Sequence, residues 1–209
     1  MSTVGVRSDK GARTRAKLLK VATVRFVASG FQRTTMADIA RDAGMTPSAL
    51  YRYFPDKEAI YLAAVDQDAG SLIDLVRRTL FAGQETTVEG LLVRVLNELS
   101  QAVEAHPLAA RSIRGVEALN PESIMALPRL GQLRQELTDL LELGQSIGLI
   151  RPDLPAKKLA LGIETIVLYQ LAYLASLRSG QVNVDGERWA ALATMIDAAL
   201  RPCHDQVGA

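Results

Sequence analysis

Hydrophobic residues recur at intervals of three and four along most of the chain, which is the spacing of amphipathic α-helices. Glycines and prolines fall between these periodic segments, at positions that suit helix ends. The pattern predicts an all-α chain of about nine helices, without strands or internal repeats. The expected helices cover residues 14–29, 36–43, 47–54, 57–80, 88–105, 108–119, 122–147 with a kink near Pro128, 156–179 and 187–200.

The clearest helix boundaries lie in residues 35–58, TMADIARDAGMTPSALYRYFPDKE. Thr35 and Asp38 have the spacing of a capping box, in which each side chain accepts a hydrogen bond from the backbone N–H of the other residue. Gly44 suits the left-handed conformation that ends a helix, and Thr46 can cap the next one. These signals predict a helix-turn-helix.

The second of these helices, residues 47–54, has two different faces. Leu50 and Phe54 fall on one side at 100° per residue. Lys57, in the first turn of the following helix, opposes the helix dipole, which a bound phosphate would explain. The other side carries groups that suit base edges and phosphates, namely Ser48, Ala49, Arg52 and Tyr53. The predicted partner is double-stranded DNA.

Residues 14–65 resemble the DNA-binding domain of the tetracycline-repressor (TetR) family of transcriptional regulators. The resemblance lies in two runs, GFQRTTMADIARDAG and TPSALYRYFPDKEAI. It implies phosphate contacts by Thr35, Tyr53 and Lys57, and positions at or near base edges for Thr46, Ser48, Ala49, Arg52 and Tyr53. It also implies that Tyr51 and Phe54 mainly hold the helix in place. Pro47 belongs to the same DNA-binding set but stands where many relatives have a basic residue, so Arg52 is expected to carry more of the readout.

The charges are unevenly distributed, although the net charge of the 209 residues is only +1. Residues 1–65 hold 11 Lys and Arg against 5 Asp and Glu, a net of +6, so the remainder carries −5. A basic head on an acidic body suits a polyanion bound at one end. We predict three segments: a basic mobile arm (1–13), a helix-turn-helix DNA-binding domain (14–65), and a ligand-binding and dimerisation domain (66–209).

The predicted arm joins the first helix near Thr14. Its basic residues could lie along phosphates or enter a minor groove, and a merely solvated tail explains them equally well. The residues concerned are Arg7, Lys10, Arg13, Arg15 and Lys17.

Residues 159–177 are apolar on nearly all sides, so they must be covered on more than one side. Glu164 and Gln170 interrupt the run, which favours burial between protein helices over a membrane span. With the last helix, this segment could form half of a four-helix bundle across a two-fold axis. The resemblance implies the same dimer, and two recognition helices would read a palindromic operator.

The resemblance also implies a pocket for a small-molecule effector in the acidic body. For each candidate residue the sequence favours a structural role over ligand binding: a surface salt bridge, a helix cap, or a hydrogen bond at the dimer interface. They are His106, Arg111, Arg114 and Glu117 at a helix junction, and Glu164, Tyr169, Gln170 and Tyr173 on the most apolar helix.

The sequence gives no support for a metal site, a cofactor or catalysis. Its single cysteine, Cys203, cannot form an internal disulfide, and with the histidines His106 and His204 makes a poor metal site. The single cysteine and the lack of a leader pattern indicate the cytoplasm. We therefore predict a homodimeric transcriptional regulator, a repressor rather than an activator, that a small, largely apolar ligand releases from DNA. The alternatives are an effector-less dimer whose body binds a protein partner, and a helical-bundle enzyme.

Overall fold

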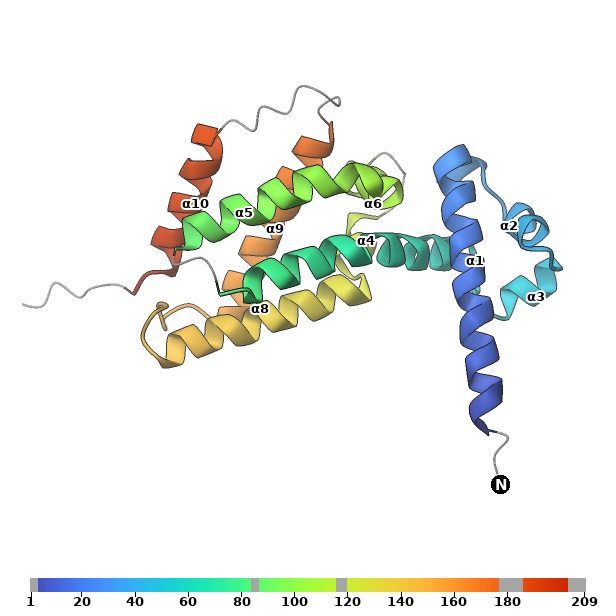
Figure 1. The fold of residues 1–209 in the computed structure, drawn as a ribbon, viewed down its shortest axis with the longest axis horizontal. Helices are drawn as coiled ribbons and strands as arrows, with labels where there is room; N and C mark the ends of the chain where they lie inside the picture. Colours follow the sequence, from blue (N-terminus) through green and yellow to red (C-terminus); the bar gives the residue numbers. More distant parts are fainter. Residues whose placement is uncertain (1–3, 84–86, 116–119, 177–185, 203–209) are drawn as a thin grey trace, which may run out of the picture. The chain divides into compact units, whose positions relative to one another are not determined.

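The computed structural model describes residues 4–83, 87–115, 120–176 and 186–202, and these are helical apart from the connecting turns (Figure 1). The predicted all-α fold is confirmed for this part of the chain. Its elements are α1 (Val4–Arg33), α2 (Met36–Ala43), α3 (Pro47–Tyr51), α4 (Lys57–Phe81), α5 (Val88–Ala102), the 3-10 helix η1 (Val103–Ala105), α6 (Pro107–Ile113), α7 (Pro121–Met125), α8 (Pro128–Ser146), α9 (Ala156–Ser176) and α10 (Gly186–Leu200).

The chain divides into two compact units. The first contains Met1–Ser71 together with His106–Leu127, and the second contains Leu72–Ala105 together with the rest of the chain from Pro128. The sequence assigned residues 106–127 to the acidic body, whereas they pack with the N-terminal helices. The functions predicted for the three segments stay predictions.

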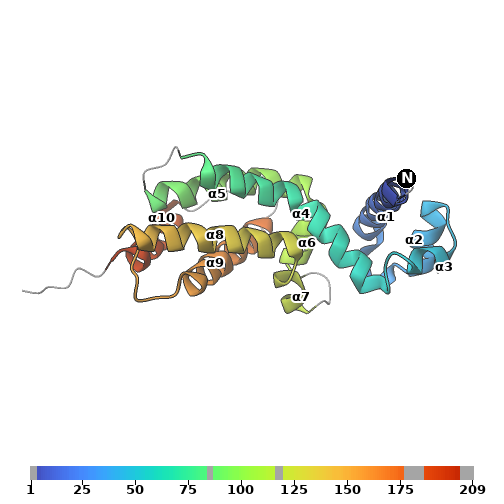
Figure 2. The same ribbon diagram turned by 90° about the horizontal axis from the view of Figure 1, so that it is seen from below.

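In the first unit, α2 packs on α1, and α3 packs on α2 (Figures 1 and 2). Three aromatic rings fill the centre: the Tyr61 ring contacts those of Phe26 and Phe31 edge-on, with centroids 4.9 and 5.0 Å away. The hydroxyl group of Tyr61 lies 2.8 Å from Oγ of Ser112 on α6, which satisfies both buried polar groups. The rings therefore join α1 to α4, and the hydroxyl contact adds α6.

The first helix begins earlier than predicted. Residues 4–13, expected to be a mobile arm, are helical and continuous with the rest of α1. Residues 4–13 read VGVRSDKGAR and include two glycines, so helix propensity does not explain why the helix extends beyond the buried core, which begins at Leu18. At the other end the prediction holds, because Gly30 leaves the helical conformation with φ of 76°.

The second unit is built around aliphatic side chains of α5, α8, α9 and α10. Helix α9 lies against α8, and α10 lies against α5 (Figure 2). In the described part of the chain, no helix is both long and apolar enough to cross a membrane. The buried core of this unit consists of Leu92, Leu141, Ala156, Ala160, Ala193, Ile196 and Leu200.

The single helix predicted over residues 122–147 is wrong, because α7 and α8 are separate. Proline disfavours a helical conformation in the residue before it, so the break falls at Leu127 and Pro128 becomes the first residue of α8. The division between the two units falls at the same bond. A proline expected only to kink a helix therefore ends one helix and begins another.

Candidate nucleic-acid interface

Reciprocal hydrogen bonds fix the start of α2, as the sequence predicts. The backbone N–H of Asp38 donates to Oγ1 of Thr35 over 3.1 Å, and the backbone N–H of Thr35 donates to Oδ2 of Asp38 over 3.1 Å. Arg41 adds an ion pair to the other carboxylate oxygen of Asp38 at 2.6 Å. The capping box is confirmed, and it orients Thr35, a predicted phosphate ligand, at the exposed end of α2.

The turn between α2 and α3 also follows the predicted chemistry. Gly44 has φ of 70° and ψ of 37°, the left-handed conformation, and its backbone N–H bonds the last turn of α2. Oγ1 of Thr46 accepts a hydrogen bond from the N–H of Ala49 over 3.3 Å, and Pro47 occupies the first position of α3. These caps set the direction in which α3 leaves α2.

Helix α3 is shorter than predicted and ends at Tyr51. Arg52 and Tyr53 lie in the following turn, where the N–H of Tyr53 donates to the carbonyl oxygen of Leu50 over 2.9 Å. Leu50 and Phe54 are buried, as their spacing predicts. The predicted DNA-binding residues of this segment lie at the surface: Thr46, Pro47, Ser48 and Arg52 are exposed, and Ala49 and Tyr53 are half-buried.

Tyr51 departs from its expected role. The resemblance implies that Tyr51 mainly holds the helix in place, yet 51% of its surface is exposed. A tyrosine exposes an aromatic face and a hydroxyl group, both of which can contact the sugar-phosphate backbone of DNA. Helical periodicity does not predict this exposure, because Tyr51 is the last residue of α3.

Lys57 has intramolecular partners that the sequence did not predict. Its Nζ donates to the carbonyl oxygen of Phe31 over 2.9 Å and lies 4.3 Å from the centroid of the Phe31 ring. The ammonium group thus stabilises the segment where α1 ends. This accounts for a lysine in the first turn of α4 without a bound phosphate, and the phosphate contact stays a prediction.

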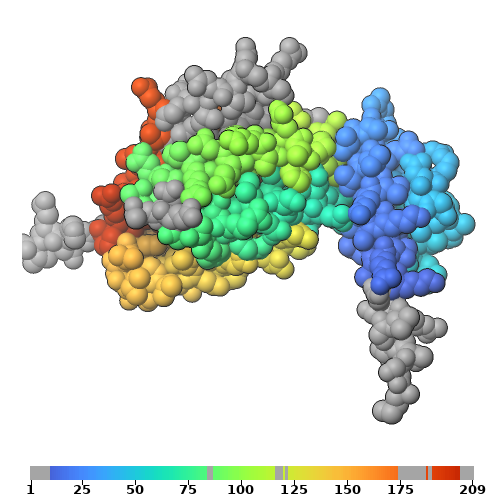
Figure 3. Space-filling view, viewed as in Figure 1, coloured from blue at the N-terminus to red at the C-terminus, as the bar shows by residue number. Residues whose placement is uncertain are grey.

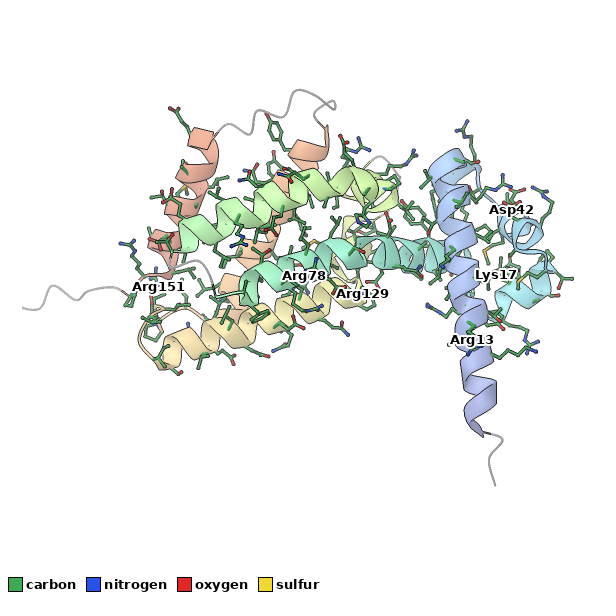
Figure 4. All side chains as sticks on the ribbon, viewed as in Figure 1. Arg13, Lys17, Asp42, Arg78, Arg129 and Arg151 are labelled. Atoms are coloured by element: carbon green, nitrogen blue, oxygen red, sulfur yellow. The ribbon has the colours of Figure 1, made fainter. Side chains whose placement is uncertain are left out.

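Helix α1 holds α2 through two long side chains. The guanidinium group of Arg25 forms an ion pair with Asp42 at 2.5 Å, and Nζ of Lys17 donates to the carbonyl oxygen of Ala43 over 3.1 Å. Figure 4 shows Lys17 on α1 and Asp42 on α2. Since Ala43 is the last residue of α2, these contacts brace the end of α2 just before the turn into α3.

Asp68 of α4 caps the start of α6. Its Oδ2 accepts hydrogen bonds from the N–H groups of Leu108 and Ala109 over 3.0 and 2.9 Å. The Nδ1 atom of His106 lies 3.4 Å from Oδ1 of the same carboxylate. His106 precedes the helix without capping it, so the carboxylate that satisfies this helix end comes from about 40 residues away.

The capping box makes the stability of the first unit depend on pH. Hydrogen bonds from the side chain and backbone of Thr35, and then from Arg41, lower the pKa of Asp38 below its ordinary value of 3.8. A carboxyl with a lowered pKa stabilises the fold above its unfolded pKa, and this stabilisation disappears as pH falls through the folded pKa. We expect Asp38→Asn to lower the urea midpoint near neutral pH, and expect the difference from the unmodified protein to vanish at strongly acidic pH.

Urea unfolding at a series of pH values measures this difference. Glu142→Gln, which removes an exposed carboxylate from α8, is the matched control. A difference for Asp38→Asn that stays constant over the whole pH range would exclude the carboxylate as the source of the stabilisation.

Residues 18–64, which cover the second half of α1, all of α2 and α3 and the start of α4, match the family described as "Bacterial regulatory proteins, tetR family". These 47 of the 209 residues are the part of the chain that is similar to the tetR family. A curated relative in Bacillus subtilis (strain 168), an uncharacterized HTH-type transcriptional regulator named YdgC, is 27% identical over 143 residues, which are 62% of this chain and 73% of the relative. The matched family and this relative are both described as regulators.

Solved structures share the fold of this chain. RolR in complex with resorcinol is 16% identical and has a TM-score of 0.64 over 91% of this chain and 90% of that one. Thermus thermophilus FadR, a tetR-family repressor in complex with lauroyl-CoA, is 21% identical and has a TM-score of 0.60 over 87% of this chain and 90% of that one. At these identities the likeness concerns the fold alone.

The predicted effector residues fall into both units of the chain. His106, Arg111 and Arg114 belong to the first unit, and Glu117 lies outside the described residues. In the second unit, Glu164 is 8% exposed and forms a two-pronged ion pair with Arg134, in which Nη2 lies 2.8 Å from Oε1. Gln170 is half-buried, and Tyr169 and Tyr173 are exposed.

A small hollow of about 10 Å³, which has room for about one water molecule, lies among α5, α9 and α10. None of the eight predicted effector residues lines it. All the side chains that do so are aliphatic: Leu92, Val93, Leu96, Ile166, Val167, Leu192, Ala193 and Ile196.

Proposed function

We propose that this tetR-family regulator is a homodimeric repressor that binds a palindromic operator through α3 and the turn after it, and that a small, largely apolar ligand releases it. The main support is the exposed polar surface of α3 on a helix-turn-helix whose ends are all capped. Regulation of transcription requires access to the chromosome, so the proposed location is the cytoplasm.

Within this proposal the DNA contacts divide into two groups. Thr35, Lys57 and the hydroxyl group of Tyr53 bind phosphates and set the register of the head on the duplex. Ser48 and Arg52 are positioned to read base edges from the major groove. Thr46 and Ala49 lie beside them, and Pro47 directs α3 without a polar contact of its own.

Selection of bound duplexes from a random-sequence pool tests the DNA part of the proposal. The expected product is a pair of inverted half-sites separated by about one helical turn or a multiple of it. Binding without any preferred sequence would contradict a regulator that reads an operator. A single asymmetric site would contradict the dimer while leaving the DNA contact intact.

The exposed apolar surface of the second unit supports the dimer. Leu161, Tyr169 and Tyr173 lie on one face of α9 at multiples of four residues, and Tyr169 is 75% exposed. Met195 of α10 is 68% exposed. Large apolar side chains grouped on helices are typical of surfaces that another protein covers. A second copy would bury α9 on both sides, as its composition requires.

Replacing Tyr169 with aspartate is expected to produce a monomer, because the new carboxylate would be buried against its own symmetry mate. Sedimentation velocity should show about twice the mass of one chain for the unmodified protein and the mass of one chain for the variant. Operator affinity should fall more than about tenfold, since only one head then binds at a time.

Leu149→Asp serves as the control for this prediction. Leu149 is 69% exposed, but it lies in the connection between α8 and α9 rather than on the proposed face. It should leave the dimer intact. A dimer that survives Tyr169→Asp would place the interface elsewhere.

The effector part rests on the fold shared with RolR and FadR, whose structures contain resorcinol and lauroyl-CoA, and on the small aliphatic hollow among α5, α9 and α10. An aliphatic lining offers no hydrogen bond, so it favours a largely apolar ligand. Both carboxylate oxygens of Glu164 are bonded to Arg134, which makes Glu164 the weakest of the proposed ligand residues. His106, Arg111, Arg114, Glu117, Tyr169, Gln170 and Tyr173 stay candidates.

A further inference from the structure

Arg25 of α1 and Asp42 of α2 form an ion pair close to the turn that leads into α3. Nε and Nη2 of Arg25 both bond the same oxygen, Oδ2 of Asp42, over 2.6 and 2.5 Å. The two side chains are 28% and 30% exposed. Partly exposed ion pairs contribute little to the stability of a fold. Overall stability is therefore a weak explanation for this pair.

Asp42 occupies a position where an acidic residue is locally unfavourable. It is the next-to-last residue of α2, and the C-terminal end of a helix carries partial negative charge. It also lies in the basic segment of the chain, where a bare carboxylate would repel the phosphates of the proposed partner. A residue that breaks a local preference is expected to have a compensating role. The ion pair with Arg25 supplies that compensation.

Apolar packing holds the last turn of α2 only weakly. The buried side chains of this turn are those of Ala40 and Ala43. A single methyl group buries much less apolar surface than a leucine or isoleucine side chain, so it stabilises a contact less. Two polar contacts from α1 act at the same turn: the Arg25–Asp42 pair, and the hydrogen bond from Nζ of Lys17 to the carbonyl oxygen of Ala43. Directional bonds to α1 therefore fix the end of α2.

Helix α3 depends on its two ends for its position. Leu50 is the one buried side chain among its five residues. At its start, the capped turn joins it to the last turn of α2. Beyond its far end, Phe54 is buried, and the guanidinium carbon of Arg15 lies 4.9 Å from the centroid of the Phe54 ring. Figure 3 shows α1 and the α2–α3 pair as neighbouring parts of one surface. A shift at the start of α3, with its far end held, would tilt the helix.

A tilt of α3 would move Ser48 and Arg52, which the proposed function places at base edges. Hydrogen bonds weaken steeply as distance and angle depart from their preferred values, and a bidentate contact with a base needs both bonds at once. The attraction between a basic side chain and phosphates carries no sequence information and depends less on orientation. A misplaced α3 would therefore lose sequence preference more than general affinity for DNA.

We propose that Arg25 and Asp42 are positioning residues, whose ion pair sets the tilt of α3 and thereby the preference for the operator over other sequences. The proposal rests on the proposed function and adds to it two residues that need not touch a base. The size of the effect is limited, because an ion pair can favour one tilt over another by no more than its own contribution.

Asp42→Asn in the full-length protein tests the pair, because charge and position predict different results. Removing a carboxylate from the head should by itself tighten binding to every duplex. Loss of positioning should lower the ratio of the affinities for the operator selected from a random pool and for a scrambled duplex by about fivefold. Glu142→Gln, which removes an exposed carboxylate from α8, is the matched control and should leave this ratio unchanged.

Further variants assign the effect to the ion pair. Arg25→Met should lower the ratio by about fivefold, and Arg25→Met/Asp42→Asn should lower it no further, since residues that act as a pair are not additive. Arg25→Lys should keep the ratio, because both nitrogens of Arg25 bond one oxygen and a single ammonium group can replace them. Urea unfolding should show similar midpoints for all of these variants, which separates positioning from stability.

Three results would overturn the proposal, and they are distinguishable. If the unmodified protein prefers no sequence, the proposed function fails and the positioning role fails with it. If it prefers an operator and Asp42→Asn tightens binding to both duplexes alike, the carboxylate acts through its charge alone. If the variants lower the urea midpoint at an unchanged ratio of affinities, the pair only stabilises the fold.

Discussion

Replacing Arg134 with methionine is expected to lower the free energy of unfolding by about 2–4 kcal/mol. Arg134 on α8 and Glu164 on α9 form an ion pair through two hydrogen bonds. Glu164 exposes only 7% of its side chain, so the substitution leaves a buried carboxylate without a partner. The effect falls below that of a fully buried pair because the Arg134 side chain is 25% exposed.

Urea unfolding of the single and double variants measures this loss. Arg134→Met/Glu164→Leu removes both charges and should recover most of the stability, since the uncompensated carboxylate is gone. Lys158→Met, which removes an exposed cation from α9, is the control and should change the stability little. An Arg134→Met variant as stable as the unmodified protein would show that the pair makes no net contribution.

Replacing Arg52 with alanine is expected to cost about 1–3 kcal/mol of binding free energy on the selected operator if its guanidinium group holds a guanine by two hydrogen bonds. Arg52 is exposed in the turn directly after α3, with no packing role that its loss would disturb. Binding to a scrambled duplex of the same length should change much less. Sequence preference should therefore relax while the fold is preserved.

Titrations of both duplexes at several salt concentrations separate this role from a phosphate contact. Lys57→Met is the comparison, and it should weaken both duplexes alike and reduce the salt slope by about 1 per protomer. It should also reduce thermal stability, because Lys57 holds the carbonyl oxygen of Phe31. Equal losses on the two duplexes for Arg52→Ala would remove Arg52 from the residues that read bases.

The helix-turn-helix was predictable because its determinants are local. A capping box needs residues three apart, a left-handed helix end favours glycine, and proline is tolerated at the first helical position. Thr35, Asp38, Gly44, Thr46 and Pro47 satisfy these requirements within a dozen residues. The exposed polar side of α3 then follows from the burial of Leu50 and Phe54.

Contacts between distant segments were not predictable in the same way. Asp68 caps a helix about 40 residues further along the chain, and Glu164 is paired with an arginine 30 residues before it. A single sequence shows which residues carry charge but not which of them form hydrogen bonds or ion pairs with one another. The sequence therefore could not show that the carboxylate of Glu164, a candidate effector residue, is already bonded to Arg134 within the second unit.

The sequence by itself determined the helical class, the helix-turn-helix with its caps and the concentration of positive charge near the N-terminus, because each depends on neighbouring residues or composition. Only the tertiary structure decided that residues 106–127 pack with the N-terminal helices and that Lys57 already has backbone partners. These outcomes depend on which surfaces meet in three dimensions. Packing between distant segments sets them, and the periodicity of one segment does not show which other segments it packs against.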